Sequence, residues 1–147
     1  MISVLILIGL FMALVTPFVM TTMDRIQRDS SARKLTSMLA SARSQAVATK
    51  TILVFQGNLD LNQYWVINPR TEESSEVMEL DRVIQFREFN DGEESWRDGI
   101  FSVTFYPLGS TSGGTIVLEP SDAEADAPSF LLNIDPVTGK PYLQYAS

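Results

Sequence analysis

The first 23 residues of the chain contain no charged side chain, and most of them are apolar. An α-helix rises about 1.5 Å per residue, so a helical run of this length can cross the ~30 Å hydrocarbon layer of a bilayer. The apolar residues fall on every face of such a helix, as expected for one surrounded by lipid or by other apolar helices. The sequence therefore predicts a membrane-embedded helix over residues 1–23.

A secretion signal and the buried helix of a soluble protein are the alternatives to this anchor. No basic residue precedes the run, it is longer than an ordinary signal core, and no small-x-small cleavage site ends it. Pro17 is expected to bend the helix or to loosen one turn, the alternative being that the helix ends there. The residues expected to face lipid or neighbouring helices are Leu5, Leu7, Leu10, Phe11, Leu14, Pro17 and Phe18.

Beyond Asp24 the helical pattern continues but becomes amphipathic. Small and apolar residues between Ala32 and Val47 recur at steps of three and four, and charged residues such as Arg43 fall between them. Residues 24–50 are predicted to form a stalk helix with one side packed on a sheet and with Arg43 in solvent. The predicted packing residues are Leu35, Met38, Leu39, Ala42 and Ala46.

From Thr51 onward the pattern changes to short runs rich in β-branched and aromatic residues, separated by turn residues. The predicted strands are residues 51–56, 63–68, 82–89, 101–106, 115–118, 129–133 and 141–145. No helical pattern lies between them, so antiparallel sheets covered by the stalk helix are expected. The sequence thus predicts an α+β fold with a β-rich head over residues 51–147, in which residues 72–81 and 121–127 form mobile acidic loops.

The charges are divided unevenly along the chain. Residues 1–50 hold six Lys and Arg against two Asp, a net charge of +4, whereas residues 51–147 hold five against sixteen Asp and Glu, a net charge of −11. So acidic a head repels phosphate backbones, which disfavours nucleic acid as a partner. The chain also contains no Cys and no His, which excludes thiol nucleophiles, histidine bases and Cys/His zinc sites within it.

Two segments resemble ligand sites in composition only. The alternating acids of Asp122–Asp126 look like the start of a calcium loop, but Ala127 and Asn133 occupy positions that require Gly and Glu. The segment Gly109–Gly114 lacks the Lys and the following helix of a phosphate-binding loop and is interpreted as a hairpin connection. No catalytic residue, metal or cofactor is therefore predicted, and the protein is expected not to be an enzyme.

Three stretches carry a family resemblance. Residues 31–49 contain an Ala-Arg-x-x-Ala pattern that ends at Ala46, and residues 135–140 form a Thr-Gly turn through Thr138 and Gly139. Residues 105–118 contain Phe-x-Pro-x-Gly-x-x-x-Gly-Gly, formed by Phe105, Pro107, Gly109, Gly113 and Gly114. Together with the apolar N-terminal helix, these stretches resemble the H-type minor pseudopilins of type II secretion and their FimT relatives, which are type IV pilin-like proteins.

The resemblance implies a structural subunit of a secretion pseudopilus that supports filament assembly and protein export across the outer membrane. It implies as partners other major and minor pseudopilins, the inner-membrane assembly platform, the lipid bilayer and, for a longer precursor, a prepilin peptidase. It also implies a single-pass protein of the bacterial inner membrane with its head in the periplasm. The alternatives are a minor type IV pilin of the FimT kind and a bitopic protein whose β head binds an envelope partner or a small ligand.

One departure from the family concerns the start of the chain. Mature members open with Phe, carry Glu at the fifth position and have a proline near position 22, whereas here the proline is Pro17 and no Glu precedes Glu72. This offset aligns Met1 with the sixth family position, so the leader, the methylated Phe and the Glu are expected upstream. A basic leader there would also outweigh the basic residues after the apolar run, which by themselves would place the head in the cytoplasm.

Overall fold

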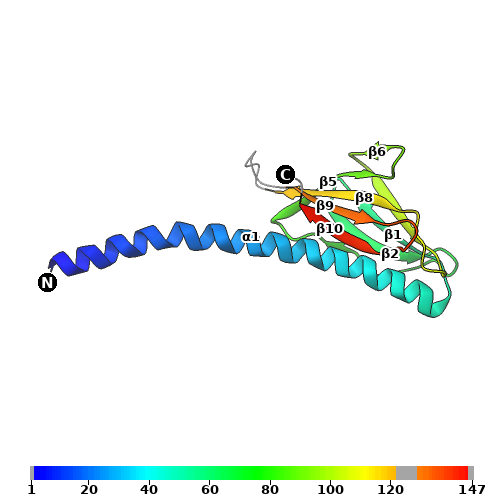
Figure 1. Cartoon of the computed structure of the whole chain (residues 1–147), viewed down its shortest axis with the longest axis horizontal. Coiled ribbons are helices and arrows are strands. Elements are labelled where there is room, and N and C mark those ends of the chain that lie inside the picture. Colours follow the sequence, from blue (N-terminus) through cyan, green and yellow to red (C-terminus); the bar gives the residue numbers. More distant parts are fainter. Residues whose placement is uncertain (1, 122–128, 146–147) are drawn as a thin grey trace.

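The structure, a computed structural model, describes the backbone of residues 2–121 and 129–145 and the side chains of residues 4–6, 26–121 and 129–145. A single long helix, α1 (Ile2–Thr49), lies along two antiparallel sheets, and its N-terminal part extends beyond them (Figure 1). The helix is continuous through Pro17. The predicted α+β class, with a long helix on antiparallel sheets, is confirmed.

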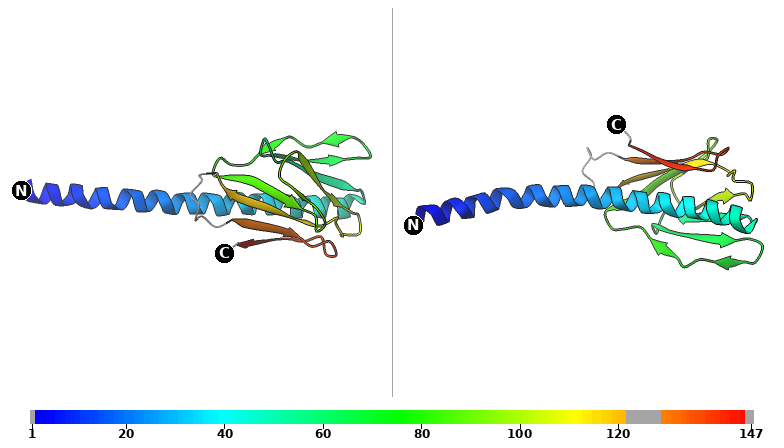
Figure 2. Two further views of the ribbon diagram at one scale, coloured as in Figure 1. Left: turned by 90° about the horizontal axis from the view of Figure 1, so that it is seen from above. Right: turned by 60° about the horizontal axis from the view of Figure 1, so that its bottom comes forward.

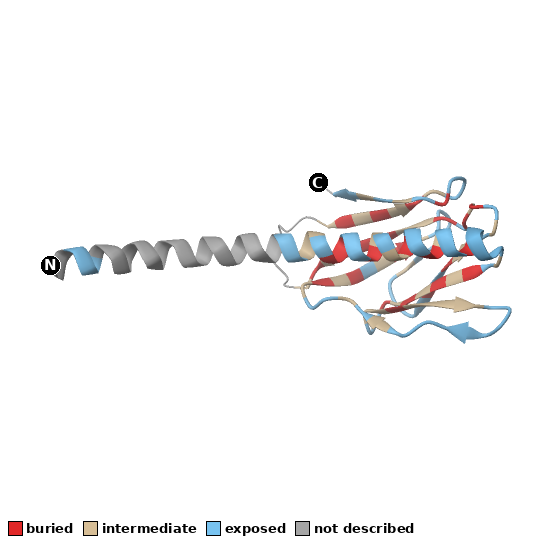
Figure 3. Cartoon of the chain, turned by 90° about the horizontal axis from the view of Figure 1, so that it is seen from below, coloured by how far each residue is buried: buried red, intermediate tan, exposed pale blue. Residues whose placement is uncertain are grey.

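The C-terminal half of α1 packs on both sheets with one face. The fully buried residues on this face follow helical spacing: Ala32, Leu35, Leu39, Ala42 and Ala46. Figure 3 shows the exposed residues on the opposite side of the helix. The helix ends where Lys50 adopts a left-handed backbone (φ 54°) and the Thr51 amide donates to the Ala46 carbonyl at 3.1 Å, which turns the chain back toward the sheets.

The first sheet has the order β3-β2-β1-β7, and β4 also pairs with β2. Its strands are β1 (Leu53–Asn58), β2 (Gln63–Asn68), β3 (Glu73–Ser74), β4 (Met78–Glu79) and β7 (Ile100–Phe105). In the pairing of β1 with β7, Leu53 lies opposite Phe105 and Asn58 lies opposite Ile100. The start of β1 and the end of β7 therefore share the end of the head at which α1 terminates.

The second sheet has the order β10-β9-β8-β5-β6. Its strands are β5 (Ile84–Asn90), β6 (Ser95–Trp96), β8 (Gly114–Pro120), β9 (Phe130–Ile134) and β10 (Pro141–Tyr145). Both sheets lie along the same half of the helix, as the two views of Figure 2 show. A chain of aromatic contacts joins the two sheets, in which Phe101 of β7 lies 6.1 Å from Phe55 and stacks on Phe89 at 4.6 Å between ring centroids. The core is thus shared by the helix and both sheets.

The predicted strands agree with the structure at residues 63–68 and 141–145, and the others differ from it by a few residues at their ends. The prediction of a mobile loop over residues 72–81 is wrong, because this segment contains β3 and β4, which pair with β2. Without β3 and β4, the edge of β2 would have unpaired backbone amide and carbonyl groups. An acidic segment can form these backbone hydrogen bonds, and its charged side chains still protect the sheet edge from pairing with other chains. The short strand β6 was not predicted. The other predicted loop lies outside the described residues from 122 onward.

Candidate functional site

Arg43 holds two hairpin connections against the helix. Its Nε donates to the Thr138 carbonyl at 2.8 Å and to the Gly109 carbonyl at 3.1 Å. The prediction that Arg43 lies in solvent is wrong, because the side chain is half-buried between α1 and these turns. A long basic side chain can lie along apolar surface while its polar head finds acceptors, which helical periodicity does not reveal. The three stretches that carry the family resemblance therefore meet at one point.

The two turns require glycine at the positions that approach Arg43. Gly109 and Gly139 have left-handed backbones, with φ of 96° and 71°. A Cβ on Gly139 would overlap the Gly109 carbonyl oxygen, and a Cβ on Gly109 would lie 2.9 Å from Nη2 of Arg43. Any larger residue would therefore push the two turns apart or displace the guanidinium.

Further hydrogen bonds join the two turns to each other. The Thr111 amide donates to the Pro136 carbonyl at 3.0 Å, and the Thr111 side chain is buried. Oδ1 of Asp135 accepts the Val137 amide at 2.8 Å and the Thr138 amide at 3.3 Å. These amide bonds lower the pKa of the Asp135 carboxyl below its ordinary value, first through Val137 and then through Thr138. The turns form one rigid unit at the end of the head where α1 terminates.

The structure places the other residues of the hairpin motif around this unit. Phe105, Gly113 and Gly139 are buried, Pro107 and Gly114 are half-buried, and Thr138 is exposed. Of the predicted packing residues, Leu35, Leu39, Ala42 and Ala46 lie in the core and Met38 packs against it. Val47 continues the spacing but is 41% exposed.

At the opposite end of the head, two polar contacts that sequence reasoning missed attach the sheets to α1. The Tyr145 hydroxyl of β10 donates to Asp29 at 2.5 Å, and Asp29 also pairs with Arg33 at 2.9 Å. The hydrogen bond to Asp29 is the main cause that raises the pKa of Tyr145. Ser31, which is buried, donates to Asp81. These partners are far apart in the sequence, so no local pattern indicated them.

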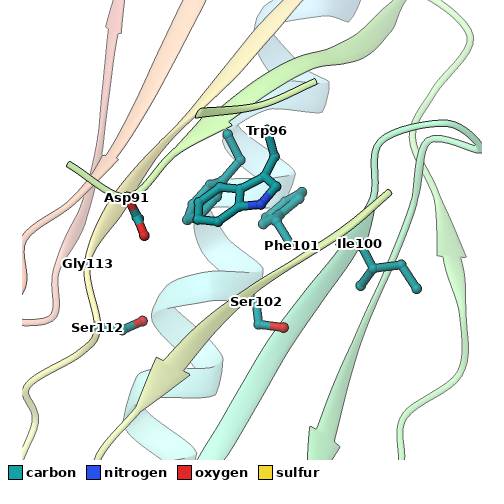
Figure 4. A pocket seen from close by; sticks show the side chains of 8 residues that line it. Asp91, Trp96, Ile100, Phe101, Ser102, Ser112 and Gly113 are labelled. Atoms are coloured by element: carbon teal, nitrogen blue, oxygen red, sulfur yellow. The ribbon is translucent and has the colours of Figure 1, made fainter. Parts of the chain in front are cut away.

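An open cleft of about 370 Å³ lies between the β5–β6 hairpin and β7 (Figure 4). Its lining residues are Phe89, Asp91, Trp96, Ile100, Phe101, Ser102, Ser112 and Gly113. Oδ1 of Asp91 accepts the Glu94 and Glu93 amides at 2.7 and 2.8 Å, which lowers the pKa of this carboxyl. The lining offers an aromatic face, hydroxyl groups and one carboxylate, and the hydrogen bonds of Asp91 Oδ1 go to the amides of its own turn rather than to either serine.

The predicted lipid-facing residues are described only in part. Leu5 is 69% exposed, whereas Leu7, Leu10, Phe11, Leu14, Pro17 and Phe18 lie outside the residues whose side chains the structure describes. Among the described residues, no helical segment is long and apolar enough to cross a membrane.

Comparison with protein families shows to which family the chain belongs. Residues 31–137 match the family described as type II transport protein GspH, and the match includes Arg43, Gly109 and the start of the turn at Asp135. The chain belongs to this family. The predicted resemblance to H-type pilin-like proteins is thereby confirmed. A comparison with curated protein sequences finds no significant match.

Solved structures share the fold of this GspH-family chain. The minor pseudopilin EpsH from the type 2 secretion system of Vibrio cholerae has 12% sequence identity and a TM-score of 0.60, over 81% of this chain and 95% of EpsH. The type IV minor pilin FimU of Pseudomonas aeruginosa PAO1 has 16% identity in two crystal forms, with TM-scores of 0.56 and 0.55, over 81% of this chain and 87% and 92% of FimU. The protein therefore has the pilin-like fold of these structures.

Proposed function

We propose that this GspH-family protein is a non-enzymatic minor pseudopilin, a structural subunit that helps to assemble a type II secretion pseudopilus and to export proteins across the outer membrane. The observation that carries the proposal is the double use of α1. Its residues from Ala32 to Ala46 complete the core of the head, and the same helix continues into the uncharged run that extends beyond the sheets. A helix fixed in this way couples the position of the head to that of the stalk.

In the proposed mechanism, residues 1–23 serve first as a single-pass anchor in the bacterial inner membrane and then as a packing surface in the filament core. Apolar stalks exchange contacts with lipid for contacts with neighbouring stalks as the subunit leaves the bilayer. The head lies in the periplasm, and its partners are other major and minor pseudopilins and the inner-membrane assembly platform. A longer precursor would be processed by a prepilin peptidase.

A minor type IV pilin is the second candidate, and the likeness to FimU favours it. Both candidates use the stalk and head in the same way and differ in the filament that the subunit joins. The net charge of −11 on the head argues against a role in binding DNA in either filament.

The test compares charges in the stalk with charges in the acidic segment, in the bacterium that produces the protein. Leu10→Arg or Leu14→Arg should abolish secretion, because a charge at bilayer depth costs at least about 2.5 kcal/mol and disrupts the packing of stalks. Leu10→Ile is the matched control, since it keeps the apolar surface. Neutralising Asp122, Glu124 and Asp126 together should leave secretion nearly intact. Normal secretion with the Arg variants, and its loss in the neutralised variant, would contradict the proposal.

A further inference from the structure

Part of strand β7 has backbone groups that no described residue pairs with. β7 lies at the end of the first sheet, where β1 is its strand partner. The Thr104 amide donates to Oγ of Ser112 at 2.9 Å and the Thr104 carbonyl accepts the Ser112 amide at 3.0 Å, both on the side away from β1. Successive residues of an antiparallel strand direct these groups to alternate sides, so Ser102 and Ile100 also direct theirs away from β1. Within the described residues, no hydrogen bond reaches the backbone of Ser102 or Ile100.

The other edges of the two sheets carry features that prevent the addition of a strand. On the first sheet, β3 and β4 have two residues each and present the exposed Glu73 and Glu79. On the second sheet, β6 has two residues, while β10 begins with Pro141 and is bonded to α1 through Tyr145. Short edges, charges and prolines are the usual protection of a sheet edge. β7 differs from them, because it has six residues and contains neither a charge nor a proline.

The unpaired part of β7 borders the open cleft of about 370 Å³, a volume within the range of ligand sites (Figure 4). Phe89 stacks on Phe101 at 4.6 Å and on Trp96 at 5.7 Å between ring centroids, so three aromatic rings form one apolar wall of the cleft. Phe89 and Phe101 are buried, whereas Trp96 is half-buried. A strand added to β7 would direct every second side chain to the face of the sheet on which Phe101 lies. Its apolar side chains would therefore reach this wall.

The charges at the cleft indicate which residues would accompany those apolar side chains. Asp91 is the one charged residue of the lining, and its Oδ1 accepts the amides of Glu93 and Glu94, whose side chains are exposed on the same turn. No described residue donates to Oδ2 of Asp91. With a net charge of −11 on the head, this surroundings favours basic residues in a partner and repels acidic ones.

We propose that β7 binds an extended peptide segment of another protein as an added strand, with apolar side chains against Trp96 and a basic residue beside Asp91. In strand addition, backbone hydrogen bonds supply affinity and alternate side chains supply selectivity. A saccharide would also stack on the aromatic wall, but it lacks the alternating donors and acceptors that match Ile100 and Ser102. Peptide binding of this kind goes beyond the proposed function, because it requires no filament.

The test follows the backbone amides of the full isotope-labelled chain in detergent micelles by nuclear magnetic resonance. The probe is the capped peptide acetyl-Lys-Thr-Val-Thr-Leu-Lys-amide, which alternates apolar and polar residues between two basic ones. We expect its addition to shift the amide signals of Ile100 and Ser102 and to slow their hydrogen exchange at least about tenfold, because strand pairing protects these donors. The Thr104 amide is the internal control, since its bond to Ser112 already protects it.

Two matched pairs separate backbone pairing from binding by side chains. Ser102→Pro removes the amide that points away from β1 and keeps the pairing with β1, so it should weaken peptide binding at least about tenfold. Ser102→Ala keeps this amide and should bind like the unchanged chain, and the melting temperatures of both variants report whether they fold. The second pair needs no variant: the same peptide with N-methyl groups on its four central residues keeps every side chain, loses these donors and should not bind.

Three outcomes would overturn strand addition at β7: unchanged signals of Ile100 and Ser102 at about 1 mM peptide, equal binding of the N-methylated peptide, and full binding by a folded Ser102→Pro variant. Shifts at Trp96 without slower exchange at Ser102 would also overturn it, because the cleft would then bind a side chain or a small ligand instead of a strand. The secretion assay with Leu10→Arg tests the proposed function separately, so either result can fail while the other stands.

Discussion

At the scale of single residues, Arg43 joins three segments that lie far apart in the sequence. One Nε atom connects α1 to Gly109 and Thr138, which are 66 and 95 residues away in the sequence. Hydrogen bonds to a charged donor contribute about 1.5–3 kcal/mol each when they are well formed, and less where solvent reaches them. Because Arg43 is half-buried, its two bonds stabilise the head at the lower end of this range.

We predict that Arg43→Asp destabilises the folded protein by about 1–3 kcal/mol, because a carboxylate there would face two carbonyl oxygens. The melting temperature, followed by circular dichroism of the purified protein in detergent, should fall by about 3 °C or more. Lys34→Asp makes the same change at an exposed position of the same helix and should cost less than about 0.5 kcal/mol. Equal melting temperatures for the two variants would show that the contact of Arg43 with the turns contributes nothing to stability.

Single residues also show which contacts could not be predicted from the sequence. Gly109 and Gly139 could be identified as important from the sequence, because they belong to the motifs of the family resemblance. The requirement for glycine at these positions comes from contacts with residues far away in the sequence, which the sequence does not show. Arg43 was assigned to solvent because helical periodicity describes one element and carries no information about distant loops. The bond of Tyr145 to Asp29 was missed for the same reason, since these residues are 116 positions apart.

At the scale of elements, the patterns that repeat over several residues were predicted best. The buried face of α1 follows the expected spacing through Leu35, Leu39, Ala42 and Ala46. Strands β2 and β10 were predicted with the bounds that the structure has. Strands β3, β4 and β6 have two residues each, too few for any alternation, and they form only because a neighbouring strand offers free backbone groups.

We predict that Leu39→Ala costs about 2–5 kcal/mol, because Leu39 is completely buried in the core and truncation leaves a cavity between helix and sheets. Denaturant unfolding of the purified protein measures this loss as a lower midpoint. Val47→Ala is the matched control on the same helix, because Val47 is 41% exposed, and it should cost less than about 1 kcal/mol. A larger effect at Val47 than at Leu39 would mean that the helix faces the sheets with a different side.

At the scale of the whole molecule, one helix combines two parts of different chemistry. Its C-terminal half is part of the core of the head, and the buried residues of α1 among those described begin at Ser31. The uncharged residues precede Asp24, so the change in chemistry comes before Asp29, which contacts Tyr145 of the second sheet. The boundaries at residues 23 and 50 remain a prediction from the sequence. The boundary at residue 23 divides one continuous helix according to the surroundings expected for its two parts, and not according to a change in fold.

We predict that the protein folds without its uncharged run. Residues 24–147 retain every helix residue of the core, from Ala32 to Ala46, so the sheets stay covered. This shortened protein should be soluble, should show mixed helix and strand by circular dichroism, and should melt cooperatively. Residues 51–147 alone are the matched control, because removal of the stalk helix exposes the apolar faces of both sheets and should cause aggregation. If the longer fragment also aggregates, or if it melts without cooperativity, the uncharged run is part of the folding unit and the division into anchor and head is wrong.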